Sequence, residues 1–259
     1  EEAPASSDAV RDLPLFAALG AVTALSGCGG SGSGGTVTAA PVAASVTLTE
    51  TQASRFLAQA AVGYSKADVS GLASSGIDAW LTSQLAMPRP QKFWDFLTAN
   101  SYDVAGNINN FNGFEPMIWS QLVGSGDILR QRIGLALLDL WVVGIDSLNT
   151  SWRQFVMAAY LDILWDNAFG NYRDIMEGVS TSVAMGNYLT YLGNVKANPA
   201  TGAIPDENYA RELMQLFTIG LYELNMDGSQ VLVSGAPVPT YTQDDVSQAA
   251  RVWTGYTYA

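Results

Sequence analysis

The chain has 259 residues, of which 48% are hydrophobic and 14% are charged, so it can bury one or two sizeable cores. Its formal net charge of −12 argues against binding of a nucleic-acid backbone, which requires clustered Lys and Arg. With no histidine and one cysteine, these residues exclude Ser-His-Asp and Cys-His catalysis, a His- or Cys-based zinc site and an internal disulfide. We expect no metal and no cofactor.

The first feature along the chain is a 13-residue apolar stretch, Leu13–Leu25, which ends just before Cys28. A membrane-spanning helix needs about 20 apolar residues, so this length favours the core of a signal peptide. The sequence Leu-Ser-Gly-Cys that closes it resembles the lipobox of bacterial lipoproteins, in which the cysteine is acylated and becomes the mature N-terminus. We therefore interpret residues 1–28 as a lipoprotein-type signal segment and Cys28 as the lipidation site. An ordinary secretory signal is the alternative, and the net negative charge before the stretch is atypical of either.

A low-complexity segment follows the cysteine. It begins with GGSGSGG and continues with Ala, Pro, Val and Thr, a composition typical of flexible and extended linkers. We interpret residues 29–48 as a tether between a lipid anchor and a domain that occupies residues 49–259. The protein is therefore expected to be exported and lipid-anchored, at the outer membrane or on a periplasmic face, and to contact the membrane through the lipid only.

From residue 49 onward, helical signals dominate. Thr47 with Glu50 and Thr49 with Gln52 form overlapping capping boxes ahead of apolar residues, so a helix is predicted to begin there. Ser65 with Asp68 predicts the start of a second helix in the same way. Gly76 follows the second of these helices. Apolar periodicity predicts further helices at 77–85, 128–143, 152–165, 172–179 and 183–192. Those at 128–143 and 152–165 are apolar enough to be central, and the short link between them predicts antiparallel neighbours.

Asp139 lies inside the apolar run LALLDLWVV of the 128–143 helix. A carboxylate buried in such a run is costly unless it is paired. The structural interpretation is a partner from another helix, such as Arg173 or Arg211. The functional alternative is an acid with a raised pKa.

Two further amphipathic helices are predicted near the end of the chain. One begins near Pro205, and its apolar face is predicted to hold Tyr209, Leu213, Leu216, Phe217 and Gly220. The other begins near Thr242. Between them, residues 224–241 predict a small β-hairpin, with Asp227-Gly228 as a turn signal. The predicted fold class is mainly α: a multi-helix orthogonal or bundle-like domain with one small β-hairpin near 224–241.

The helix near Pro205 also carries the candidate site residues. Glu207 and Arg211 are four residues apart, as are Asn208 and Glu212. The structural interpretation is an i,i+4 ion pair and a polar network of Asn208, Arg211 and Glu212 that fixes the helix in the domain. The catalytic alternative uses Glu207 or Glu212 as the acid/base, with Arg211 holding an anionic group and Asp139 as a further candidate.

Five stretches resemble, in the right order, the successive blocks of one exported bacterial family, domain of unknown function 1800. They are ASRFLAQAAVGYSKADVSGLASSGIDAWLTSQL, RQRIGLALLDLWVV, NAFGNYRDIMEGVSTSVAMGNYLTYLGN, DENYARELMQLFTIGLYELN and YTQDDV…ARVWTGY. Members of that family are usually much longer, so the chain is expected to hold the N-terminal part of the domain, truncated at its C-terminus. Trp253, Tyr256 and Tyr258 are expected to pack against the missing part.

The resemblance implies a role only indirectly, since the biochemistry of the family is not established. Its genes commonly lie beside those of a second exported family, domain of unknown function 1501, which implies a shared pathway or complex. We expect a non-catalytic binding or assembly component that acts with such a protein and binds no nucleic acid. The alternative is an envelope hydrolase that uses Asp/Glu acid–base chemistry on a glycoside-like substrate, completed by the missing part. The sequence leaves open whether the chain is an enzyme.

Overall fold

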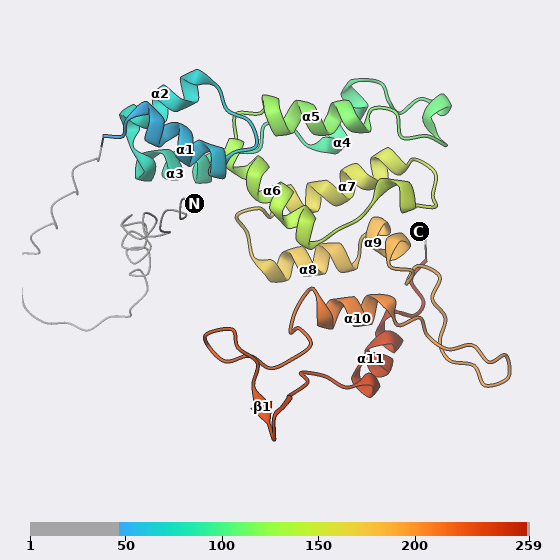
Figure 1. The fold of residues 1–259 in the computed structure, drawn as a ribbon. Coiled ribbons are helices and arrows are strands. Elements are labelled where there is room, and N and C mark those ends of the chain that lie inside the picture. Colours follow the sequence, from blue (N-terminus) through green and yellow to red (C-terminus); the bar gives the residue numbers. More distant parts are fainter. Residues whose placement is uncertain (1–46, 258–259) are drawn as a thin grey trace, which may run out of the picture. The chain divides into compact units, whose positions relative to one another are not determined.

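The computed structural model of the chain describes residues 47–257. The expected signal segment with Cys28, residues 29–46 of the expected tether, and residues 258–259 lie outside the described residues. The described part is mainly helical and contains one two-stranded antiparallel sheet, which confirms the predicted fold class (Figure 1). Within these residues, no helix has the length and apolar character that crossing a membrane requires.

The elements follow one another in a simple order. The first helices are α1 (Glu50–Ala60), α2 (Lys66–Ser75), α3 (Ile77–Ala86), α4 (Phe93–Ala99), η2 (Ala105–Asn107) and α5 (Phe114–Gly124). The next are α6 (Ile128–Leu140), η3 (Ile145–Ser147), α7 (Arg153–Asp166), α8 (Tyr172–Ser180), α9 (Val183–Tyr188) and α10 (Asn208–Gln215). The strands β1 (Leu232–Val233) and β2 (Ala236–Pro237) precede α11 (Gln243–Ala250) and η4 (Arg251–Trp253).

Of the two overlapping capping boxes predicted for the first helix, the one at Thr49 begins α1, and the predicted box at Ser65 begins α2. The Thr49 hydroxyl accepts from the backbone N–H of Gln52 at 3.2 Å, and Gln52 Oε1 accepts from the backbone N–H of Thr49 at 2.9 Å. Ser65 and Asp68 make the equivalent bonds at 3.2 and 2.7 Å. Gly76, with a φ of +80°, separates α2 from α3. Local sequence therefore sets the first helix boundaries.

Two helices end earlier than their apolar pattern predicts. The helix predicted to reach residue 143 ends at Leu140, where Trp141 leaves the helical conformation and is fully buried. The helix predicted to reach residue 192 ends at Tyr188, and Thr190 adopts a left-handed φ of +62°. A β-branched residue rarely adopts that conformation. Contacts outside the helix therefore override the apolar period in this segment.

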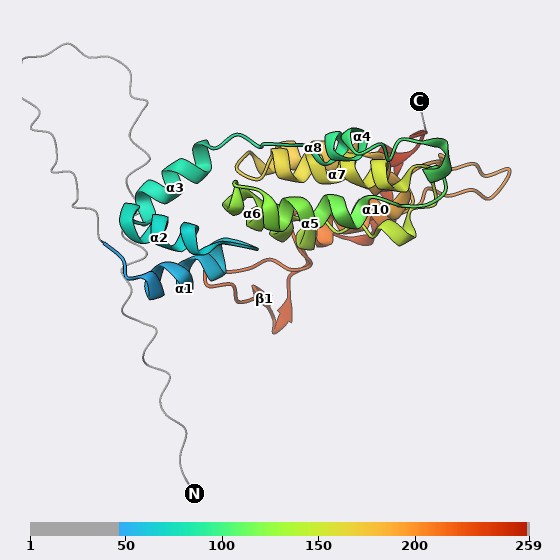
Figure 2. The same cartoon turned by 90° about the horizontal axis from the view of Figure 1, so that it is seen from above.

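α7 lies at the centre of the helical packing, in contact with α4, α6, α8 and α9 (Figures 1 and 2). Two glycines allow close crossings. A Cβ atom on Gly134 of α6 would lie 2.4 Å from the Trp165 ring, and one on Gly178 of α8 would lie 2.7 Å from Ile163. The central position predicted for the 152–165 helix is confirmed. In α6 only the first half is buried, through Ile128, Leu129, Arg130, Gln131 and Gly134.

The buried apolar side chains form three clusters. The main one extends over α4 to α10, and a second joins α1, α2 and α3 to Ile128 of α6. The third holds α10 against α11 through Ala210, Val246 and Ala250. The two helices predicted near the end of the chain therefore pack directly on each other.

Residues 216–241, called the arm below, connect α10 to α11. β1 and β2 pair in the arm across Ser234 and Gly235, whose φ angles of +54° and +82° suit a two-residue hairpin turn. The predicted hairpin is therefore confirmed. The Asp227-Gly228 turn lies beside it and closes a separate bridge between Leu224 and Gln230.

One prediction of packing near the end of the chain is wrong. Leu216 is exposed, because α10 ends at Gln215 and the helical period ends with it. The Trp253 ring lies 4.7 Å from that of Tyr209, and the Tyr256 ring lies 5.4 Å from that of Tyr191. Both aromatic side chains are half-buried, and their expected packing against a missing part stays a prediction. Tyr258 lies outside the described residues.

Candidate functional site

Glu207 lies where α10 meets α11. Its carboxylate accepts hydrogen bonds from Ser247 at 2.7 Å and from Gln243 at 2.9 Å, both on α11. Arg211 donates to the same carboxylate at 2.9 Å and to Gln243 at 3.2 Å. The Glu207 and Arg211 side chains are still 32% and 40% exposed. The predicted i,i+4 ion pair is therefore present, and it bridges two helices at the surface.

Asn208 belongs to a different set of contacts. Its Nδ2 atom donates to the hydroxyl of Thr190 at 2.9 Å, and its backbone N–H donates to Asp206 at 2.8 Å. Asp206 also accepts from the Thr190 hydroxyl at 3.0 Å, and the backbone N–H of Asp206 donates to Asn194 at 2.8 Å. These bonds tie the start of α10 to the turn that follows α9.

Asn208, Arg211 and Glu212 therefore do not form one network. Asn208 bonds to the α9 turn and Arg211 to Glu207 and α11. Glu212 is half-buried, and its Oε2 atom has no hydrogen-bond partner among the described residues. The four-residue spacing places Asn208 and Glu212 on one helix face, but their partners lie in different parts of the fold.

The prediction that Asp139 is buried is wrong. Asp139 is exposed, one residue before the end of α6, and it forms no ion pair with Arg173, Arg211 or any other described residue. Only the first half of α6 is buried, so an apolar run at its end does not imply burial of the carboxylate. An exposed carboxylate stays solvated and needs no partner.

The surroundings of Glu207 also limit what it can do chemically. The hydrogen bonds from Ser247 and Gln243 hold the pKa of Glu207 below its usual value, with a smaller contribution from Arg211. A general acid that works near neutral pH needs a pKa shifted in the opposite direction. Glu207 is therefore suited to joining two helices in its charged form.

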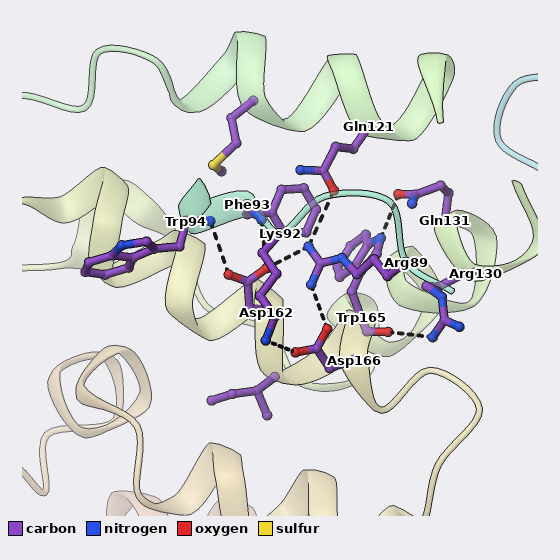
Figure 3. A network of polar contacts seen from close by, with 12 residues as sticks. Arg89, Lys92, Phe93, Trp94, Gln121, Arg130, Gln131, Asp162, Trp165 and Asp166 are labelled. Carbon is purple, nitrogen blue, oxygen red and sulfur yellow. Dashed lines mark hydrogen bonds and ion pairs between the residues drawn. The ribbon is translucent and has the colours of Figure 1, made fainter. Parts of the chain in front are cut away.

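A second polar cluster lies beside the loop that joins α3 to α4 (Figure 3). Asp162 of α7 accepts hydrogen bonds from the backbone N–H groups of Phe93 and Trp94, at 2.8 and 3.1 Å, where α4 begins. Arg89 in the loop lies 2.6 Å from the same carboxylate, and the Arg89 and Asp162 side chains are only 7% and 11% exposed. The carboxylate accepts hydrogen bonds from amides that have no partner within α4. Its negative charge also interacts favourably with the positive, N-terminal end of the α4 helix dipole.

Asp166, one turn along α7, completes this cluster. It pairs with Arg89 at 3.0 Å and with Lys92 at 2.7 Å (Figure 3). Burial raises the pKa of Asp162, although Arg89 opposes the shift. Burial acts on Asp166 too, but hydrogen bonds from Lys92 and Arg89 outweigh it and lower the pKa of Asp166. We call Arg89, Lys92, Asp162 and Asp166 the α4–α7 clamp.

A chain of buried hydrogen bonds continues from α7 to α6. The indole N–H of Trp165 donates to Gln131 at 2.7 Å, and the Gln131 side chain donates to Asp127 at 2.9 Å. Arg130 lies 3.3 Å from Asp127 and donates to the Trp165 carbonyl at 3.2 Å. These contacts pair most of the buried polar groups between the two helices, although Asp127 Oδ2 and Arg130 Nε form an ion pair with no hydrogen bond.

Comparison with known protein families gives a match over most of the described residues. A model of the family described as a protein of unknown function, DUF1800, matches residues 55–259. The chain belongs to the DUF1800 family. The resemblance seen in the sequence is therefore confirmed. No curated protein and no solved structure matches the chain.

The DUF1800 match includes both clusters, but sequence reasoning found only the one at Glu207. The clamp joins Arg89 and Lys92 to acids more than 70 positions away, so no local spacing pairs them. One signal was available: Asp162 and Asp166 lie four residues apart in a helix predicted to be central. A carboxylate buried there requires a partner, for the same physical reason that the sequence raises at Asp139.

The arrangement favours a structural role for both clusters in this DUF1800 chain. Each clamp carboxylate is bonded to a cation, and Asp162 also holds the start of α4. Within the part of the chain that the structure describes, no group of three or more His, Cys, Asp or Glu side chains could hold a metal ion.

Proposed function

We propose that this DUF1800 chain is a non-catalytic binding component of the cell envelope. It is exported, lipid-anchored through Cys28, and acts with a second exported protein of the DUF1501 family. Three things support the proposal: the lipobox-like sequence, the gene neighbourhood that the family resemblance implies, and the surface of the arm. The surface of the arm is the main support for a binding role.

The arm presents apolar side chains to solvent. It extends away from α10 and α11 (Figures 1 and 2) and carries only two charged residues, Glu223 and Asp227. Exposed apolar side chains gathered in one segment favour an interaction site. Its exposed large apolar residues are Leu216, Ile219, Leu221, Tyr222, Leu224, Met226, Leu232 and Val233.

The base of the arm is fixed to the domain. The Phe217 ring is buried and stacks on Trp141 at 4.2 Å, and the Tyr172 hydroxyl donates to the Phe217 carbonyl at 2.6 Å. At the other end, the Thr240 side chain donates to the Gly220 carbonyl. A surface held in this way needs little ordering when it binds a partner, which lowers the cost of association.

We do not propose the alternative, a hydrolase based on carboxylates. Glu207, the carboxylate best placed by the sequence, accepts bonds from Ser247, Gln243 and Arg211 of its own chain. Its lowered pKa suits a permanent charge. Asp139 is exposed at the end of α6.

The test of this function is direct binding between two purified proteins. The whole chain is immobilised and titrated with the DUF1501 protein from the same organism. We expect saturable binding, weakened at least tenfold by the triple substitution Leu224→Ser, Met226→Ser and Val233→Ser. The matched control replaces three apolar residues that are exposed elsewhere, Leu85→Ser, Val104→Ser and Val123→Ser.

The control variant should bind as the wild type does. Absence of binding by the wild type, or equal losses in both variants, would contradict the proposal.

The lipid anchor has a test of its own. The full gene is expressed in a bacterial host with labelled palmitate, and we expect the label on the wild type but not on a Cys28→Ser variant. Equal labelling of the two would remove Cys28 as the lipidation site.

A further inference from the structure

A pocket of about 710 Å³ lies between the loop after α9 and the end of α11. The loop contributes Lys196 and Ala197, and α11 contributes Gln248. The residues after α11 contribute Arg251, Val252 and Thr254. None of these described lining residues is acidic, whereas acids outnumber bases 24 to 12 in the whole chain. Two of the few cations of an acidic protein therefore share one pocket.

Both cations are available to a ligand. Arg251 donates to Gln248 at 2.8 Å, and neither Lys196 nor Arg251 forms an ion pair with another described residue. Gln248 in turn donates a hydrogen bond to the carboxylate of Asp244 at 3.5 Å. A neutral amide therefore stands between Arg251 and that acid.

The pocket is built on a fixed backbone. The N–H of Gly193 donates to the Tyr256 carbonyl at 2.8 Å, and the N–H of Gly255 donates to the Asn194 carbonyl at 2.9 Å. The buried Asn194 side chain donates to the Trp253 carbonyl at 3.4 Å. These bonds hold the loop that carries Lys196 against the turn that carries Arg251, so the backbone itself brings the two cations to one pocket.

We infer that this pocket binds the phosphate group of an anionic ligand. A lysine ammonium and an arginine guanidinium make charge-assisted hydrogen bonds to phosphate oxygens, and arginine offers paired donors. Gln248 and Thr254 supply neutral polar groups beside them. In a chain of net charge −12, such a pocket gives an anion a local site that the rest of the molecule does not favour.

The phosphate can belong to a soluble ester or to a lipid headgroup. Val195 and Val252 are exposed beside the two cations, an arrangement that also suits a membrane surface. Two probes separate these sources. Glycerol 3-phosphate is titrated by calorimetry, and vesicles of phosphatidylglycerol are compared with vesicles of phosphatidylcholine by co-sedimentation.

The test compares two variants of equal charge change in the whole chain. The first is Lys196→Gln with Arg251→Gln. The second is Arg55→Gln with Lys66→Gln, which removes two cations from a different pocket whose lining includes Glu50. All are judged on samples whose circular dichroism matches the wild type, and Lys196→Gln alone replaces the first variant if that one fails to fold.

We expect the wild type to bind at least one of the two phosphate probes. The Lys196/Arg251 variant should bind it at least tenfold more weakly, and the Arg55/Lys66 variant less than twofold more weakly. Binding of the ester identifies a soluble ligand, and binding of phosphatidylglycerol vesicles alone identifies a headgroup; either supports the site. Absence of binding to both probes, or equal losses in the two variants, would overturn it.

Discussion

The α4–α7 clamp and the arm break the usual rule of burial in opposite directions. The clamp buries two charged side chains, Arg89 and Asp162, which pair with each other, and Arg89 also pairs with the less buried Asp166. The arm places apolar side chains at the surface, and large ones such as Met226 and Leu224 stay exposed. Charges inside are thus matched within the chain, whereas the apolar groups outside are free to meet another molecule.

This difference indicates that the arm, and not the clamp, is the region to examine for function. A buried ion pair whose carboxylate also holds the start of a helix is explained by the fold that it holds together. An ordered apolar surface is not explained by the fold, because the chain gains nothing from keeping such side chains in water. If the two regions differ in this way, substitutions in the clamp should lower stability and substitutions in the arm should weaken binding.

The largest expected effect is at the clamp. Asp162→Ala leaves Arg89 with one carboxylate fewer and removes the acceptor for two amides of α4. Breaking a buried pair costs about 3–5 kcal/mol. Urea unfolding of the Asp162→Ala variant should therefore show a loss of that order in the free energy of unfolding. The control is Asp139→Ala, an exposed acid in a helix, which should change the free energy of unfolding by less than about 0.5 kcal/mol.

If the Asp162 and Asp139 variants unfold at the same urea concentration, the clamp does not stabilise the fold.

A smaller loss is expected where α6 crosses α7 beside the clamp. Gly134→Ala would place a methyl group 2.4 Å from the Trp165 ring, and such overpacking costs about 1–3 kcal/mol. Gly71→Ala is the matched control, since it also lies within a helix but its Cβ would meet nothing within 4 Å. The Gly71→Ala substitution should stabilise the folded state by about 0.5–1 kcal/mol. Thermal melts of both variants check the opposite signs.

Asp166 gives the clamp a pH dependence. Its pKa in the folded state is lowered, below an unfolded value of about 3.9. A lowered pKa contributes stability that is present above the unfolded value and lost as the pH falls through the folded one. The gap in stability between the wild type and Asp166→Asn should therefore be full above about pH 5 and should close below about pH 4. A gap that does not change over this range would contradict the assignment.

The smallest effect is expected at the junction of α10 and α11. The pair of Arg211 and Glu207 is about one-third exposed, and exposed pairs contribute about 0.2–1 kcal/mol. Arg211→Ala should therefore lower the melting temperature by only a few degrees. A loss as large as that of Asp162→Ala would show that the junction, not the clamp, holds the fold together.

Much of the fold follows from local sequence. Capping residues such as Thr49 and Ser65 set helix starts, because the hydrogen bonds involved span only three positions. Helix ends follow less well. Thr190 leaves the helix although its neighbours continue the apolar pattern, and its hydroxyl bonds to Asp206, 16 residues away.

Among the polar clusters, too, local contacts could be predicted and long-range ones could not. The pair of Glu207 and Arg211 could be predicted, since it lies within one helix turn. The clamp could not, because the partners of Asp162 come from a loop near residue 90 and depend on tertiary packing. Asp139 shows the converse error: an apolar run suggests burial, whereas the last two residues of α6, Asp139 and Leu140, are exposed.

The most direct test of the account is hydrogen–deuterium exchange of the whole chain, with and without the purified DUF1501 protein. We predict that exchange slows at residues 216–241 when the partner is added, while the amides of Phe93 and Trp94 at the clamp, already bonded to Asp162, remain unchanged. Slowed exchange elsewhere with none in the arm would contradict the claim that the exposed apolar side chains serve a partner.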